Sequence, residues 1–271
     1  MKKHFLNILL IFLTLNLFSQ KDGCEIKNIA FQTGERVTYE ISYNWIGIPW
    51  LKVGYAAFSV LEKKLNNKNY FYLFGVGSTY ESWEWFYKIK ATHKSYVDPE
   101  TLKQIYFKRD VKEPNFFIDI EYKFNWEDTV AYSRFESKKD DLTLDTIKVP
   151  NCTFDLMSIL YYARNLDYSK YKPGEKIPIT LLLDKEITPL YFRYLGKDNL
   201  RLRKIGKFEC IKLSVFLVEG TMFHEGENME IWVTNDKNRI PLMIKSPIVV
   251  GSVKAKLVSY DGLRNPMDAK R

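Results

Sequence analysis

The chain has 271 residues, of which 46% are hydrophobic and 15% aromatic, and its formal net charge is +8. Lysines are scattered along the chain with acids among them, as in the KKDD run at 138–141. This pattern is typical of a solvated surface and argues against a nucleic-acid-binding protein. The length is sufficient for a sizeable core and lies within the range of single all-β sandwiches and barrels.

Residues 1–20 are predicted to form a signal peptide. Lys2 and Lys3 precede an apolar run from Phe5 to Phe18, which is too short to span a bilayer comfortably. Cleavage after Gln20 would leave a net charge of +6 and an exported chain that is not an integral membrane protein. An uncleaved anchor and a lipoprotein anchored through Cys24 are the alternatives. The lipoprotein is disfavoured because two charged residues, 21 and 22, separate the apolar run from the cysteine.

Three cysteines follow the predicted leader. Cys210 lies in an apolar strand pattern and is interpreted as a small core residue. Cys24 and Cys152 both lie at expected element boundaries. Because an oxidising compartment permits one bridge among three cysteines, we predict a Cys24–Cys152 disulfide that ties the new N-terminus to the body of the protein.

Period-two alternation dominates the rest of the chain. At 35–45 apolar and polar residues alternate, which predicts a strand with one solvated face, whereas 50–62 is apolar on both alternating faces and predicts a strand covered on both sides. Further strands are expected at 70–78, 89–97, 102–107, 116–126, 129–135, 143–149, 176–183, 189–194, 207–219, 228–234 and 249–260. This succession predicts an antiparallel, mostly consecutive sheet.

One helix is expected at 154–165, with Asp155 as its N-cap and Arg164 near its end. Arg164 is a candidate for pairing with a buried acid or with the anionic head of a ligand. The aromatic segment at 83–87 is interpreted as a second helix or as a continued strand. Either segment is a candidate to cover the strand at 50–62.

We therefore predict an all-β fold, in which a long curved antiparallel sheet forms a half-barrel or a two-layer β structure with one short packed helix. Residues 21–262 are expected to form a single β-rich domain, and 263–271 a flexible C-terminal tail. The solvated strand faces argue against a membrane-embedded barrel wall.

No residue pattern indicates catalysis, a metal or a cofactor. His224 would need a second histidine at position 228 to match a zinc-protease motif, and that residue is Asn228. His93 lies in a strand pattern and is interpreted as a sheet residue. Nucleophile motifs and glycine-rich phosphate loops are also missing from the sequence. We predict a non-catalytic protein, with an unrecognised hydrolase as an alternative.

Three segments together resemble the bacterial family called domain of unknown function 3108, over about residues 29 to 260. The matching residues are Phe31, Gly34, Glu35, Tyr39 and Gly54 at the start, Asp155, Ser158, Tyr161, Tyr162 and Arg164 in the helix, and Trp232, Asp236, Arg239, Pro241 and Gly251 near the end. The resemblance implies an exported, β-rich envelope protein of Gram-negative bacteria, with no established activity, cofactor or catalytic residue to transfer. The leader also resembles those of Bacteroidetes, which is consistent with a periplasmic location.

Two classes of function remain. In the first, the concave face of the sheet binds a lipid or another apolar envelope molecule through Tyr43, Trp45, Trp50 and Trp83. In the second, the 42 aromatic residues fill the core of a structural or protein-interaction scaffold. The partner is then an unidentified envelope ligand or protein, and the positive charge allows peripheral association with a membrane.

Overall fold

The computed structural model describes residues 24–45, 49–217, 226–248 and 250–271, which form one large sheet with one α-helix among them. The predicted signal peptide at 1–20 and His224 lie outside these ranges. The strands are β1 (Arg36–Asn44), β2 (Leu51–Leu65), β3 (Lys68–Thr79), β4 (Lys90–Val97), β5 (Gln104–Glu113), β6 (Phe116–Asn125), β7 (Val130–Ser137), β8 (Thr143–Lys148), β9 (Thr153–Phe154), β10 (Lys176–Leu183), β11 (Glu186–Leu202), β12 (Gly206–Leu217), β13 (Gly226–Thr234), β14 (Pro241–Pro247) and β15 (Ser252–Asp261). The helices are α1 (Leu156–Ala163) and two short 3-10 turns, η1 (Glu81–Trp83) and η2 (Tyr168–Lys170).

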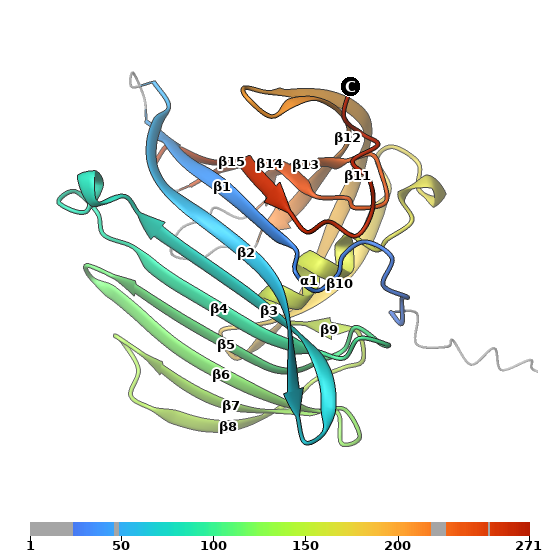
Figure 1. Ribbon diagram of the computed structural model, residues 1–271. Coiled ribbons are helices and arrows are strands. Elements are labelled where there is room, and N and C mark those ends of the chain that lie inside the picture. Colours follow the sequence, from blue (N-terminus) through green and yellow to red (C-terminus); the bar gives the residue numbers. More distant parts are fainter. Residues whose placement is uncertain (1–23, 46–48, 218–225, 249) are drawn as a thin grey trace, which may run out of the picture.

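The fifteen strands follow the order β8-β7-β6-β5-β4-β3-β2-β1-β15-β14-β13-β12-β11-β10-β9. All neighbours pair antiparallel except β9 and β10, and β1 joins the two halves of the chain by pairing with both β2 and β15. A twisted sheet of this width cannot stay flat, and it curls around α1 (Figure 1). The predicted all-β fold, with one long curved antiparallel sheet and one short helix, is confirmed.

The two ends of the curled sheet differ. The last residues of β1, β3, β12 and β14 and the first residues of β2, β4, β13 and β15 lie at one end, which we call the open end. At the other end, which we call the helix end, the strands meet α1, the N-terminal segment 24–35 and the C-terminal residues (Figure 1). Hydrogen bonds tie the N-terminal segment there, for example from the backbone of Ile29 and Ala30 to the side chain of Asn165.

The helix begins where the sequence predicts. The carboxylate of Asp155 accepts hydrogen bonds from the backbone of Met157 and Ser158, at 2.7 and 2.8 Å, and the hydroxyl of Ser158 accepts one from the backbone of Asp155 at 2.9 Å. This capping box satisfies donors that a helix start leaves unpaired. Buried side chains lie on several sides of α1, because it sits inside the curve of the sheet.

Residues 263–271 do not form the expected flexible tail. Lys270 bridges to Phe208, the backbone of Glu209 donates to the carbonyl of Ala269 at 2.9 Å, and Ala269 is 1% exposed. Leu263 and Met267 pack against the apolar cluster around Phe208. The segment is short, but its apolar residues give it enough buried surface to dock.

We expected the helix or the 83–87 segment to cover the strand β2, and this expectation is only half correct. A methyl group built on Gly75, the partner of Phe58 on the inner face, would lie 3.2 Å from the sulfur of Met157, so α1 covers that face. On the outer face Tyr55 is 39% exposed. The 83–87 segment leaves the sheet at the open end, where Trp85 is 79% exposed, and it covers neither face.

Candidate functional site

The concave face of the sheet carries an aliphatic surface that the protein covers only partly. Strand pairing places Ile231, Ile244, Ala255 and Ile41 in one continuous row across β13, β14, β15 and β1. All four are half-buried, whereas Leu257, two residues toward the helix end from Ala255, is 1% exposed. We give the name inner apolar surface to seven half-buried aliphatic residues with inward side chains: Ile41, Ala56, Ala91, Ile231, Ile244, Val253 and Ala255.

The helix adds to this partly covered region. Leu156 and Leu160 are half-buried, and their spacing of four residues places them on the same face of α1. In a core that is packed throughout, inward aliphatic side chains are fully buried. The inner apolar surface and this face of α1 are therefore only partly covered by the rest of the described chain.

Over strands β5 to β8, the concave side of the sheet is filled by the turn between β10 and β11. The guanidinium of Arg109 donates to Asp184 at 2.7 Å, and the backbone of Lys185 donates to the hydroxyl of Tyr122 at 2.9 Å. Lys185 also lies 3.5 Å from Asp145 and above the ring of Phe135. The turn thus reaches the inner faces of β5 to β8.

His93 lies on the inner face beside this filled region. Burial and the positive charge of Arg109 lower its pKa to about 4. Its imidazole is therefore neutral near neutral pH and lies in a tilted contact with Phe107. Within the described ranges, no group of three His, Cys, Asp or Glu side chains is placed to hold a metal ion.

The four predicted ligand-facing aromatics all lie at the open end, but they do not line the concave face together. Tyr43 shares the inward register and donates its hydroxyl to the carbonyl of Val250 at 3.1 Å. Trp45 is 46% exposed beyond β1, and Trp83 is half-buried in η1. A bulge between residues 41 and 42 shifts the pairing of β2, and Trp50 packs on the outer side beneath Lys254. The partly covered part of the concave face is mainly aliphatic, and Tyr43 and Phe58 are aromatic residues on it.

Arg164 pairs with a buried acid. Its guanidinium makes two bonds to the carboxylate of Glu35, at 2.5 and 2.8 Å, and Nε donates to the carbonyl of Asn238 at 2.9 Å. Burial opposes the guanidinium charge, but the carboxylate outweighs this effect and raises the pKa of Arg164. The guanidinium of Arg164 thus joins segments of the protein that are distant in sequence, and it is buried. Nothing in the local pattern around Glu35 had marked it as the partner.

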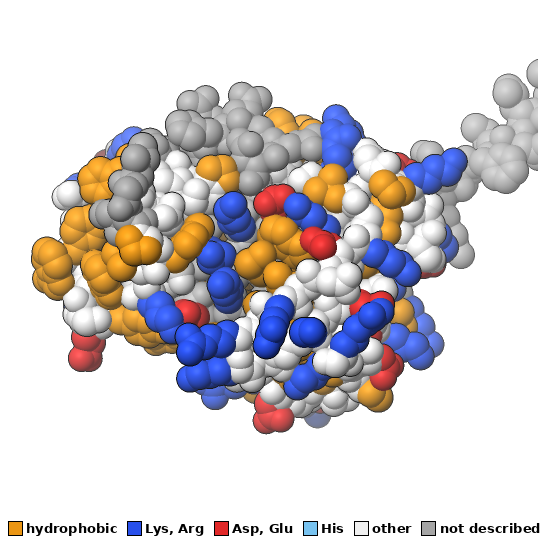
Figure 2. Space-filling model, turned by 90° about the horizontal axis from the view of Figure 1, so that it is seen from above, with side chains coloured by type: hydrophobic (Ala, Val, Ile, Leu, Met, Phe, Trp, Pro, Cys, Tyr) orange, Lys and Arg blue, Asp and Glu red, His pale blue; other side chains and the backbone are white. Residues whose placement is uncertain are grey.

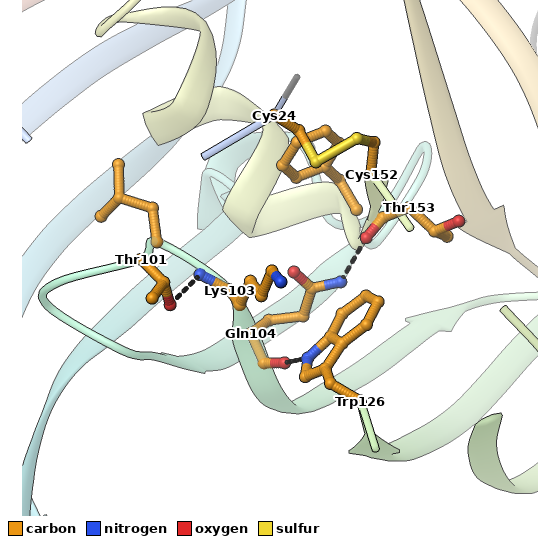
Figure 3. A pocket seen from close by; sticks show the side chains of 9 residues that line it. Cys24, Thr101, Lys103, Gln104, Trp126, Cys152 and Thr153 are labelled. Carbon is orange, nitrogen blue, oxygen red and sulfur yellow. Dashed lines mark hydrogen bonds between the residues drawn. A yellow bond between two sulfur atoms is a disulfide. The ribbon is translucent and has the colours of Figure 1, made fainter. Parts of the chain in front are cut away.

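Cys24 and Cys152 are joined by a disulfide. Beside it lies a cavity of about 10 Å³, room for roughly one water molecule (Figure 3). Gln104 donates to the carbonyl of Thr153 and Trp126 donates to the carbonyl of Gln104, both at 2.7 Å. These contacts are structural. The disulfide fixes the N-terminal segment, and the two hydrogen bonds join side chains and backbone from distant strands beside it.

A larger cavity of about 430 Å³ lies near η1, lined by residues of β2, β3 and β4. Its lining includes outward-facing residues such as Tyr55, Ser78 and Lys90, together with Glu81 and Glu84. Tyr55 stacks on Tyr80 with ring centroids 6.1 Å apart. The volume suits a small molecule, but the charged lining is unsuited to an apolar one.

The profile of the family described as Protein of unknown function (DUF3108) matches residues 38–258. The chain belongs to the DUF3108 family. A solved structure, a beta-barrel-like protein of the domain of unknown function DUF1849 from Brucella abortus, matches this DUF3108 protein with a TM-score of 0.56 over 87% of this chain and 98% of that chain. At 11% sequence identity the likeness concerns the fold alone. No curated protein matches this chain significantly. Among the described helices, none is long and apolar enough to cross a membrane.

Proposed function

We propose that this DUF3108 protein is an exported, non-catalytic envelope protein that holds an apolar, lipid-like molecule against its inner apolar surface. The observation that carries the proposal is the row of half-buried aliphatic side chains on the concave face, Ile231, Ile244, Ala255 and Ile41. Each Å² of apolar surface that stays in contact with water forgoes about 25 cal/mol of hydrophobic stabilisation. An acyl chain laid along the row would recover that free energy.

Two features of the chain support a location in the envelope. The basic and apolar pattern of residues 1–20 is that of a signal peptide. The Cys24–Cys152 disulfide is of the kind that persists in oxidising compartments. The proposal of a non-catalytic role rests on the sequence, which contains no recognised nucleophile or phosphate-loop motif.

A scaffold of the cell envelope is the second candidate. It is favoured by the filled interior of the arm formed by β5 to β8, where the β10–β11 turn and its ion pairs occupy the concave side. A scaffold would bind a protein partner at its surface and would need no apolar ligand.

The test is to export residues 21–271 to a bacterial periplasm, purify them without detergent, and combine native mass spectrometry with organic extraction. An equimolar co-purifying apolar molecule is expected. Ala255→Phe fills part of the inner row and should abolish binding, whereas Val258→Phe on the same strand, where the native side chain is 42% exposed, should leave it unchanged.

A clean mass without ligand is decisive only together with a direct binding experiment. We would therefore titrate the purified protein with N-phenyl-1-naphthylamine, an uncharged apolar fluorophore. If neither the native mass nor the fluorescence reports an apolar occupant, the carrier function is wrong and the scaffold remains.

A further inference from the structure

The outer face of the sheet, opposite the inner apolar surface, carries a cluster of lysines. Lys245 on β14 lies directly across from Lys254 on β15, and Lys256 follows two residues later on the same face. We call these three residues the lysine triad. Figure 2 shows Lys and Arg side chains gathered over the middle of the molecule on the side seen from above.

No described carboxylate lies within salt-bridge distance of the lysine triad. The two acids on this face are already engaged, Glu40 by Lys52 at 2.6 Å and Glu230 by Lys212 at 2.5 Å. Like charges directly opposite each other on neighbouring strands destabilise a sheet. Glu230 lies directly across from Lys245, and Glu40 directly across from Lys256. These two acids also serve Lys52 and Lys212, so the cluster as a whole keeps an excess of positive charge that an external anion would offset.

Lys254 contacts an aromatic ring but no described carboxylate. Its Nζ lies 3.6 Å from the centre of the Trp50 ring. Partial burial, followed by the charges of Lys256 and Lys245, lowers its pKa to about 8. The other charged groups on this face are Glu40 on β1, Lys52 on β2, Glu230 on β13 and Lys212 on β12. A bound anion would raise this pKa.

Exposed apolar residues lie at the open end, beyond the strands β1 and β15 that adjoin the triad. Val250, 50% exposed, precedes β15, and Trp45, 46% exposed, follows β1, the strand that pairs with it. Figure 2 shows hydrophobic side chains gathered toward the left of the lysines, at the open end. Lysines beside exposed aromatic and aliphatic side chains are the composition of surfaces that lie in the headgroup region of anionic bilayers.

We propose that this face docks on the surface of an anionic lipid bilayer, with the lysine triad against the lipid phosphates and Val250 and Trp45 at the level of the headgroups. The docking face and the inner apolar surface lie on opposite sides of the sheet. The inference therefore stands independently of the proposed carrier function, and its test changes no residue of the inner surface.

The experiment is co-sedimentation of residues 21–271 with vesicles of equal parts phosphatidylglycerol and phosphatidylcholine. Each lysine near an anionic surface contributes roughly a fivefold gain in partitioning, so replacing all three triad lysines with glutamine should weaken binding about 100-fold. Replacing them with arginine should preserve binding. Salt at about 1 M should release the wild type, and binding should decline as the pH is raised beyond 8.

The matched control replaces Lys112, Lys123 and Lys148 with glutamine, because these exposed lysines on β5, β6 and β8 carry the same total charge. It should bind like the wild type. An equal loss in the control, or equal wild-type binding to pure phosphatidylcholine vesicles, would overturn the proposal. Displacement from vesicles by millimolar inorganic phosphate would also overturn it, because that result would indicate a discrete anion site. Thermal unfolding of each variant verifies that it is folded.

Discussion

The guanidinium of Arg164 is the point at which three distant parts of the chain meet. It bonds to Glu35 before β1, to the carbonyl of Asn238 between β13 and β14, and to the carbonyl of Ala30 at 3.3 Å. The rings of Phe31 and Tyr161 lie 5.7 and 5.4 Å from it. Because Arg164 and Glu35 are 5% and 1% exposed, each charge depends on the other for compensation.

Glu35→Gln should therefore destabilise the protein strongly. The variant keeps the shape of the side chain but leaves the guanidinium buried without a counter-charge, which costs roughly 3–5 kcal/mol in comparable pairs. Urea unfolding measures the loss. The double variant Glu35→Gln/Arg164→Met should lose less than the sum of the single variants, since neither charge remains. A loss below about 1 kcal/mol in Glu35→Gln would show that the pair is not the charged centre of the fold.

At the scale of the element, α1 depends on a cap whose acid is buried. The carboxylate of Asp155 also accepts a hydrogen bond from the hydroxyl of Ser95 on β4 at 2.8 Å, so the cap anchors the helix to the sheet. Burial raises the pKa of Asp155 to about 6, although four hydrogen bonds act in the opposite direction. The folded state thus binds a proton at this site more readily than the unfolded chain does.

This shift predicts how Asp155→Asn alters the pH dependence of stability. The contribution of Asp155 is most favourable below the unfolded pKa near 4, declines as the pH rises, and is constant above about 6. Asparagine caps helices equally well and does not titrate. From pH 7 to pH 4, the stability of the wild type relative to the variant should rise by roughly 1–3 kcal/mol.

The matched control is Asp167→Asn at the start of η2, where the hydroxyl of Ser169, opposed by a small degree of burial, lowers the pKa of the acid. There the difference should move in the opposite direction over the same pH range. Chemical denaturation at several pH values supplies both curves. Parallel curves for the wild type and Asp155→Asn would show that the acid does not titrate in this range.

At the scale of the whole molecule, the disulfide closes a long loop. Cys24 and Cys152 are 128 positions apart, so the bridge ties the N-terminal segment to the junction between β8 and β9. It thereby anchors the short connection between β8 and β9, the two edge strands of the sheet, to the N-terminal segment. Closure of a loop of this length restricts the unfolded chain considerably.

Cys24→Ser should lower the free energy of unfolding by roughly 2–5 kcal/mol, because the unfolded chain regains that freedom. Thermal unfolding with and without a reductant is the measurement. The reductant should bring the wild type down to the level of the variant and leave the variant unchanged.

Burial raises the pKa of the Cys210 thiol to about 12, so this cysteine should not react in the folded protein. Alkylation of Cys24 and Cys152 without prior reduction would contradict the bridge.

Local patterns in the sequence determined much of the secondary structure. Alternation at 116–126 corresponds to β6 (Phe116–Asn125), and Asp155 caps α1 as expected. Patterns were less informative where polar residues continue a strand, because a ladder can extend over residues with no apolar alternation. Thus β11 (Glu186–Leu202) runs well beyond the expected 189–194. The strand β14 (Pro241–Pro247) was not among the expected strands.

The sequence by itself determined an all-β chain with one capped helix, because period-two and helical patterns depend on neighbours in the chain. Only the tertiary structure decided which face became concave, which acid met Arg164, and where the residues after 262 docked. Those outcomes depend on contacts between residues far apart in sequence. Trp50 illustrates the reason: a bulge beside Ile41 shifts the pairing of β2, and Trp50, just before that strand, lies under Lys254 and not on the concave face where it was predicted.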